Sequence, residues 1–432
     1  MALEINATLG LTDALHFQPK AASVASRSVR TIIQPTSSGA QTPGSIVRFQ
    51  FPTGAPNQFL DPQNTYLSFT VTNNDPTAAT TMTVAGSAYS FISRADTFSA
   101  GGLKDSIPQY GVLVNALLDL QYKAGAGATA GNVMFGTSSN ATATIDRTGI
   151  SIPTGGSADF TLPLACLAVI GTNNKKMLPL SKLQNLELQL YMESVLHAVT
   201  TASTTCTFNF SNMAIIANYI NLDPGMARVI EQQNGGRYVI SSSAWQNVQY
   251  TPSAGRTQDA FLVPGKYQSL TGALVTYRDA AHMNVQTDNS ITARVNPFSS
   301  ATGLRCQVQW RLGSTYVPAQ PIAGVVELFA NTHEFLHALA DVDHGGRINL
   351  ANYSQAAYAG GGATMGAFVL GQNFTSTIGK SATITSGMDT YSTTTVLSTV
   401  FPQSNPLANV VDIFCNFDYI IEITDAGMQV RY

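Results

Sequence analysis

The sequence has 432 residues, of which 11% are charged and 44% hydrophobic, and its formal net charge is -3. A normal hydrophobic content with a small net charge excludes a disordered chain, and the scarcity of charge argues against a solvated helical bundle. The near-neutral balance also excludes a protein that holds nucleic acid mainly by electrostatic attraction.

The first 43 residues have only weak periodicity and predict an extended N-terminal arm. The opening residues have neither a cationic region nor an apolar core of a signal peptide, so we expect no secretory signal. No apolar run approaches the roughly 18 residues of a transmembrane helix. The arm mixes apolar side chains with scattered cations, namely Leu9, Leu11, Leu15, Phe17, Lys20, Arg27 and Arg30.

Alternating apolar and polar residues begin near residue 46 and recur along the chain. In residues 46–51 the apolar positions on one face are Val47, Phe49 and Phe51. A period of two with one apolar face is typical of half-buried antiparallel strands. The same period occurs in residues 66–72, 186–190, 207–210 and 304–310.

Helical patterns are few: one covers residues 110–120 and another residues 325–339. Residues rich in Gly, Pro, Asn and Asp separate the alternating segments, which is typical of turns between strands. We therefore predict an all-β protein of sandwich architecture, with short helices in the connecting loops.

A domain boundary is predicted at Asp223-Pro224-Gly225, near the midpoint of the chain. The tetrapeptide 223–226 is echoed by residues 425–428 at the end of the sequence, which is a weak sign of duplication. Units of about 200 residues suit one eight-stranded sandwich with long loops. The expected division is an arm over residues 1–43, a first unit over 44–225 and a second over 226–432.

The four cysteines are too far apart for a zinc ribbon or a compact disulfide framework. Each lies in an apolar or alternating segment, so we expect buried free thiols. They are Cys166, Cys206, Cys306 and Cys415.

One catalytic pattern is present at residues 333–337, which read H-E-x-x-H. In zinc proteases two such histidines bind the metal and the glutamate between them is the general base. A third ligand is not evident, because the Gly of the extended metzincin pattern is Ala340 here. On a helix, His333 and His337 would also lie about 90° from the centre of the apolar stripe. We therefore interpret the segment as an amphipathic helix whose imidazoles face solvent or a neighbouring subunit.

Several segments recur in a fixed order along the chain. In the first half they are residues 59–67, 92–98, 107–113, 162–164, 177–180 and 186–190. In the second half they are residues 263–270 with 277–278, 310–314, 317–322, 386–390 and 411–432. Together these segments resemble the major capsid proteins of the double jelly-roll lineage, which includes polinton-like viruses, virophages, large DNA viruses and tailless membrane-containing phages.

The resemblance implies two consecutive eight-stranded jelly-roll β-sandwiches. It further implies a structural subunit, and not an enzyme, that forms pseudo-hexagonal homotrimers tiling an icosahedral shell. A short helix commonly follows a segment like 310–322 in this lineage, which accounts for residues 333–337 without zinc. No catalytic residue, metal or cofactor is then expected.

The expected partners are copies of the same chain, neighbouring capsomers, and penton and minor capsid proteins, without specific nucleic-acid binding. The protein would assemble inside the host cell and reside in the virion, and residues 1–43 would contact neighbours or an internal membrane. Two alternatives remain open at this point. One is a β-sandwich binding or adhesion module, and the other is a zinc hydrolase that uses His333, Glu334 and His337.

Overall fold

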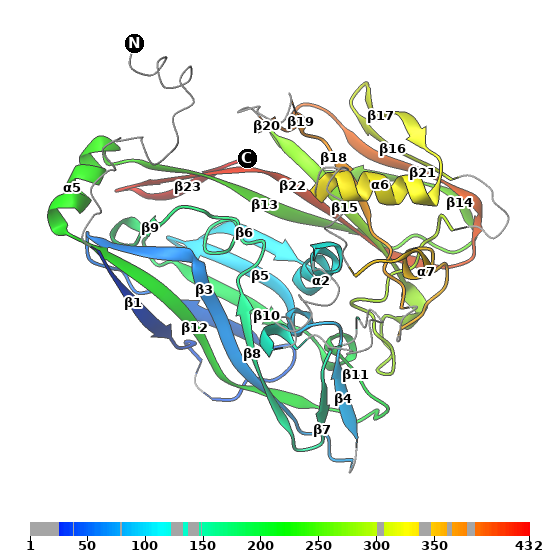
Figure 1. Cartoon of the computed structure of the whole chain (residues 1–432), viewed down its shortest axis with the longest axis horizontal. Coiled ribbons are helices and arrows are strands. Elements are labelled where there is room, and N and C mark those ends of the chain that lie inside the picture. The colour runs from blue at the N-terminus through cyan, green and yellow to red at the C-terminus, as the bar shows by residue number, and fades with distance from the viewer. Residues whose placement is uncertain are drawn as a thin grey trace, which may run out of the picture.

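The computed structural model describes residues 26–37, 39–77, 80–121, 133–136, 147, 149–299, 306–336, 347–360, 365–377 and 385–432. Within these ranges the chain is mainly β-structure, and its strands form two sandwiches that lie side by side (Figure 1). Each sandwich consists of two antiparallel sheets. No helix in the described ranges combines the length and the apolar character needed to cross a membrane.

The first sandwich uses strands from the N-terminal half. One sheet has the order β1 (Ser26–Ile33), β12 (Phe208–Leu222), β3 (Gln58–Asn73) and β8 (Ser157–Pro163), with β9 (Leu178–Pro179) also paired to β3. The facing sheet has the order β2 (Ile46–Gln50), β10 (Glu187–Met192), β5 (Ile92–Ser99) and β6 (Gly102–Pro108). A smaller sheet contains β11 (Val199–Thr200), β4 (Thr81–Val84) and β7 (Ser151–Pro153).

The second sandwich repeats this plan with strands from the C-terminal half. One sheet has the order β13 (Tyr238–Tyr250), β22 (Asn409–Thr424), β15 (Leu270–Asp279) and β18 (Leu370–Asn373), with β23 (Gly427–Arg431) also paired to β22. The facing sheet has the order β14 (Arg256–Val263), β21 (Thr395–Asn405), β16 (Gln307–Leu312) and β17 (Thr315–Ile322). A short hairpin joins β19 (Ser376–Thr377) to β20 (Thr385–Ser386).

The strand order identifies both sandwiches as jelly rolls. When the eight main strands of each half are counted along the chain, one sheet contains the first, eighth, third and sixth, and the other contains the second, seventh, fourth and fifth. This interleaving of two Greek keys is the jelly-roll topology. Both halves have the same order, so the predicted all-β fold of two consecutive eight-stranded jelly rolls is confirmed.

The alternating residues build the interior of each sandwich. Val47, Phe49 and Phe51 are buried, and the polar residues between them are exposed. In the second half, Cys306, Val308 and Trp310 likewise point inward. Because successive side chains of a strand point to opposite faces, one inward set of apolar residues from each sheet fills the space between the sheets.

The helices lie in the connections. The two predicted from periodicity are α2 (Tyr110–Gln121) and α6 (Val325–Leu336), and the remainder of the predicted 325–339 segment lies outside the described residues. In the connection from β12 to β13, α5 (Pro224–Gln233) follows Asp223, whose side chain accepts hydrogen bonds from the N–H groups of Gly225 and Met226. Other short helices among the described residues include η2 (Ala88–Phe91), η3 (Leu180–Lys182), α4 (Val195–Ala198), η4 (Ala280–His282) and α7 (Leu350–Tyr353).

Part of the segment predicted as an N-terminal arm over residues 1–43 forms a strand. Residues 26–33 form β1, which pairs along its whole length with β12. β1 is an edge strand whose side chains are mostly exposed, so backbone hydrogen bonds to β12 hold it in the sheet. Its sequence therefore lacks the apolar alternation by which the other strands were predicted. Arg27 and Arg30 therefore lie on the first sandwich, whereas residues 1–25 lie outside the described residues.

Candidate functional site: the contact between the two sandwiches

The two sandwiches meet along the edges of two sheets. Strand β6, at the edge of the first sandwich, contacts β13 of the second. The hydroxyl of Tyr419, on β22, donates a hydrogen bond to the backbone carbonyl of Lys104 on β6. The side-chain amide of Asn173 donates to the carbonyl of Ser243 on β13 over 2.8 Å. These contacts fix one sandwich against the other through backbone carbonyls.

A cavity of about 360 Å³ lies between the sandwiches and is lined by residues of both. Its walls carry the aromatic side chains of Tyr89, Trp245 and Phe335. The amide of Asn416, another wall residue, donates to the carbonyl of Ala244 over 3.3 Å and is therefore already engaged in the wall itself.

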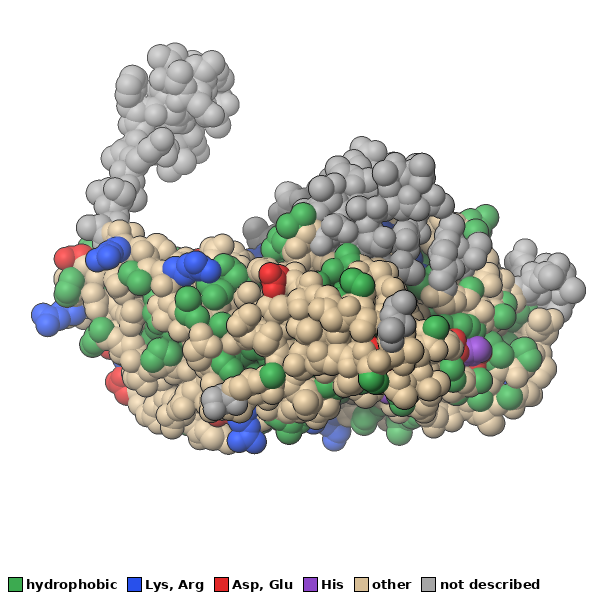
Figure 2. Space-filling model, turned by 90° about the horizontal axis from the view of Figure 1, so that it is seen from below, with side chains coloured by type: hydrophobic (Ala, Val, Ile, Leu, Met, Phe, Trp, Pro, Cys, Tyr) green, Lys and Arg blue, Asp and Glu red, His purple; other side chains and the backbone are tan. Residues whose placement is uncertain are grey.

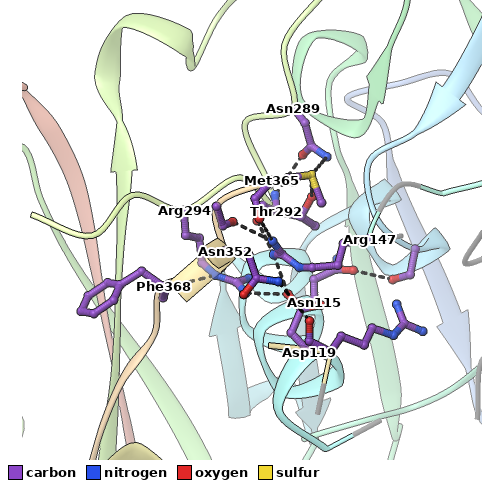
Figure 3. Close-up of polar contacts among 12 residues, drawn as sticks. Asn115, Asp119, Arg147, Asn289, Thr292, Arg294, Asn352, Met365 and Phe368 are labelled. Carbon is purple, nitrogen blue, oxygen red and sulfur yellow. Dashed lines mark hydrogen bonds and ion pairs between the residues drawn. The ribbon is translucent and has the colours of Figure 1, made fainter. Parts of the chain in front are cut away.

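A buried ion cluster forms the most polar part of this contact (Figure 3). Asp119 near the end of α2 accepts from Arg147 over 2.6 Å and from Arg294 over 2.5 Å, both at the same oxygen, Oδ2. The side chains of the three residues are 6%, 1% and 0% exposed, respectively. Asp119 belongs to the first half and Arg294 to the second, so the ion pair joins the two sandwiches.

The arginines of the cluster also hold the loops of the second half. Arg147 donates to the carbonyls of Thr292, Met365 and Gly366 over 2.7, 2.8 and 2.7 Å, respectively. Nε of Arg294 donates to the carbonyl of Phe368 over 3.1 Å. Guanidinium donors have a fixed planar geometry, so these bonds allow one arrangement of the loops around α2.

The electrostatics of the cluster favour an ionised carboxylate. Burial raises the pKa of Asp119, but the charges of Arg147 and Arg294 lower it by more. The pKa of Asp119 is therefore below its usual value. A carboxylate that is buried beside two cations stays charged at neutral pH. The cluster is therefore ionic under ordinary conditions.

The sequence contains one indication of this cluster that periodicity alone does not detect, namely a single acidic residue in an apolar helical segment. Residues 110–121 are apolar apart from a few positions, and Asp119 is the one acid among them. Such an isolated charge in a buried helix requires a partner. The partners were not identifiable, because Arg147 is 28 positions away and Arg294 is 175 positions away.

A second polar contact between the halves involves His197. Nδ1 of this imidazole lies 3.1 Å from Oε1 of Glu193, and Nε2 lies 3.2 Å from Oδ1 of Asn284 in the second half. The hydrogen bond to Glu193 raises the pKa of His197 despite partial burial. Only the doubly protonated ring donates at both nitrogens, so this contact is strongest when the histidine is charged.

The helix with the H-E-x-x-H pattern packs on the second jelly roll. Its residue Phe335 lies against β15, where a Cβ on Gly272 would come within 2.1 Å of the phenyl ring. The hydroxyl of Thr332 donates to the carbonyl of Val369 and accepts from the N–H of Gly371 over 2.9 Å. These residues explain the segment as a docked amphipathic helix.

The two residues of the zinc pattern that the structure describes lie away from this docked face. The side chain of His333 is partly buried and that of Glu334 is exposed, and His337 lies outside the described residues. Across the described ranges, no group of three His, Cys, Asp or Glu side chains has a geometry suited to a metal ion. The described structure therefore does not bring together a ligand set at this helix.

The prediction of buried free thiols is confirmed. All four cysteines are buried and unpaired with one another. Burial raises the pKa of Cys206 and Cys306 to about 11 and that of Cys166 and Cys415 to about 12. Thiols with such values are protonated at neutral pH and pack as small apolar side chains.

No protein-family model matches the sequence, and a comparison with curated proteins finds no significant relative. Solved structures, in contrast, match over nearly the whole chain. The VP54 protein of PBCV-1, in a crystal structure fitted into a reconstruction of the virophage Sputnik, has a TM-score of 0.60 at 12% identity and covers 96% of this chain and 100% of its own.

Two further structural matches are major capsid proteins by name. That of Faustovirus has a TM-score of 0.56 at 10% identity and covers 98% of this chain and 96% of its own. That of mavirus has a TM-score of 0.50 at 11% identity and covers 98% of this chain and 94% of its own. With the strand order described above, these matches establish that the chain has the double jelly-roll fold of viral major capsid proteins.

Proposed function

We propose that the protein is a viral major capsid protein and resides in the virion. The observation that carries this proposal is the fold: two jelly rolls of identical strand order in one chain, matching capsid proteins over nearly its full length. Fold alone does not determine function. Here, α6 packs on the second jelly roll, and the described residues bring no three potential metal-binding side chains together at His333 and Glu334.

The assembly unit in this proposal is a homotrimer. Two similar sandwiches per chain, taken three times around an axis, present six similar units and therefore a pseudo-hexagonal outline. Contacts between different faces of neighbouring chains close into a ring under threefold symmetry. Such trimers would tile the facets of an icosahedral shell, with a division between the jelly rolls near residue 225.

The surface of the molecule suits dense packing of many copies. On the face in Figure 2 the charged side chains are few and widely spaced. Only 11% of the residues are charged and the net charge is -3, so electrostatic repulsion between identical neighbours is small. In the shell, penton and minor capsid proteins would be the further partners, and the segment before β1 would contact neighbours or an internal layer.

Native mass spectrometry of the purified full-length protein tests the proposal. We expect a metal-free species of about three times the chain mass of 45.8 kDa. Deletion of residues 2–25, which stops before β1, should keep the trimer and impair particle assembly, as judged by electron microscopy. A monomer with one bound zinc would contradict the proposal, and a metal-free monomer would favour a β-sandwich binding module.

A further inference from the structure

The buried cluster between the sandwiches has an unbalanced charge. The guanidiniums of Arg147 and Arg294 share a single carboxylate, that of Asp119, and both contact the same oxygen of it. Their other hydrogen-bond acceptors are backbone carbonyls, which carry no formal charge. Among these three side chains, two positive charges face one negative charge, and all three are almost fully inaccessible to water. The buried Arg347, whose charge also lowers the pKa of Asp119, adds a further cation close by.

Two N–H groups of the cluster also lack an acceptor. Within the described part of the chain, Nε of Arg147 and Nη1 of Arg294 are buried and have no hydrogen-bond partner. Leaving a buried charged donor unsatisfied costs more than leaving a neutral one, so native proteins rarely do it. Because both guanidiniums contact Oδ2 of Asp119, these two groups belong to one small region.

The pKa of Arg294 reflects the same excess of positive charge. Burial lowers the pKa of Arg294 to about 10, and the neighbouring charges of Arg147 and Arg278 act in the same direction, whereas Asp119 opposes them. Arg278 has its own carboxylate partner, Asp412, at 2.6 Å. The second carboxylate that would balance Arg294 is therefore not supplied by the Arg278 pair.

We propose that this cluster binds one small monovalent inorganic anion of the chloride class, which accepts hydrogen bonds from Nε of Arg147 and Nη1 of Arg294. A bound anion offsets the excess positive charge of Asp119, Arg147 and Arg294, whereas a water molecule satisfies the N–H groups and leaves that charge. The anion would contact residues that fix α2 of the first sandwich and the loops of the second. Its binding therefore stabilises the contact between the two jelly rolls.

The first test compares the melting temperature of the full-length protein in sodium chloride and sodium gluconate at equal ionic strength. A ligand that binds only the folded state raises stability with its concentration. We expect the melting temperature to rise by about 1–2 °C for each tenfold increase in chloride above the dissociation constant. Equal melting temperatures in the two salts would overturn the proposal.

The second test locates the anion directly. Crystals grown or soaked in sodium bromide should give an anomalous scattering peak within hydrogen-bonding distance of Arg147 Nε or Arg294 Nη1. Peaks confined to the protein surface would mean an adventitious ion only, and would reject the site.

A pair of variants separates this site from general salt effects. In Arg294→Met the remaining Asp119–Arg147 pair is neutral, so the difference between chloride and gluconate should disappear. The matched control is Arg256→Met, because Arg256 is also largely buried but has one carboxylate to itself, that of Asp259 at 2.8 Å. The control should lose stability and keep the chloride effect. A chloride effect that persists in Arg294→Met would contradict the assignment, and the wild-type comparison decides the question if this variant does not fold.

Discussion

The interior of each sandwich and the contact between the sandwiches are held together by different interactions. In the first jelly roll, Phe91 lies among the rings of four other phenylalanines, with centroid distances of 5.3–6.1 Å, namely Phe69, Phe160, Phe208 and Phe210. Between the jelly rolls, in contrast, guanidinium groups, one carboxylate and backbone carbonyls add charged hydrogen bonds to the apolar packing that continues across both halves.

The two kinds of interaction contribute differently to the stability of each sandwich and to the orientation of one sandwich against the other. Apolar packing is strong and tolerates small shifts, because it depends mainly on buried area and volume. Charged hydrogen bonds are directional and fail when their geometry changes. The apolar cores therefore supply most of the stability, and the directional bonds of the ion cluster favour one placement of the first sandwich against the second.

The largest effect is expected from removing the charge of Asp119. Asp119→Asn keeps the shape of the side chain but leaves two buried guanidiniums without a carboxylate, and breaking a buried ion pair costs about 3–5 kcal/mol. Chemical denaturation should detect this loss. The exposed acid Asp159, which accepts from Thr70 at the surface, is the control, and Asp159→Asn should change stability little. Similar losses in both variants would contradict the role assigned to the cluster.

A smaller effect is expected from equivalent substitutions in the two cores. Ile215 on β12 and Ile413 on β22 occupy the eighth strand of their jelly rolls, and both are fully buried. Ile215→Val and Ile413→Val should each lower the free energy of unfolding by about 0.5–1.5 kcal/mol, without altering the contact between the sandwiches. Hydrogen exchange should locate each loss in its own sandwich. Exchange that increases across the junction in either variant would contradict the separation.

The smallest effect is expected from the pH dependence of the His197 contact. Because Glu193 raises the pKa of His197 above its usual value of 6.5, the stabilisation is fully present below pH 6.5. It is lost as the pH rises through the folded-state pKa. The difference in melting temperature between wild type and His197→Gln should therefore be larger at pH 5.5 than at pH 8.5.

The comparison with His197→Gln is needed because a second group, Asp105, titrates in the same pH range. Burial raises the pKa of Asp105 on β6 to about 7, so the wild type alone reports both groups. The difference between wild type and variant isolates His197. In Glu193→Gln the pH dependence of this difference should move to lower pH, and an unchanged profile would show that Glu193 is not the cause of the raised pKa.

Periodicity predicted the strands that have one buried face. The apolar positions of residues 46–51 are buried as expected, and α2 occupies the predicted helical segment. In these elements the positions that are apolar in the sequence are also the positions that are buried in the fold. The alternation of apolar and polar residues is therefore enough to identify the buried face.

Two features could not be obtained from the sequence in this way. β1 has little apolar alternation, because it is attached to β12 through backbone atoms, which are the same in every residue. The ion cluster joins residues as far as 175 positions apart, and a single sequence carries no information on which distant charges meet. Contacts of this kind depend on the completed fold.

The fifth strands of the two jelly rolls occupy equivalent edges but meet different surroundings. β6 is covered by β13, whereas β17 ends its sheet and contains two prolines, Pro318 and Pro321. Proline has no backbone N–H, so an edge with two of them offers fewer donors to an approaching strand. At high protein concentration, the exposed edge is consequently a poor template for intermolecular β-sheet growth and aggregation.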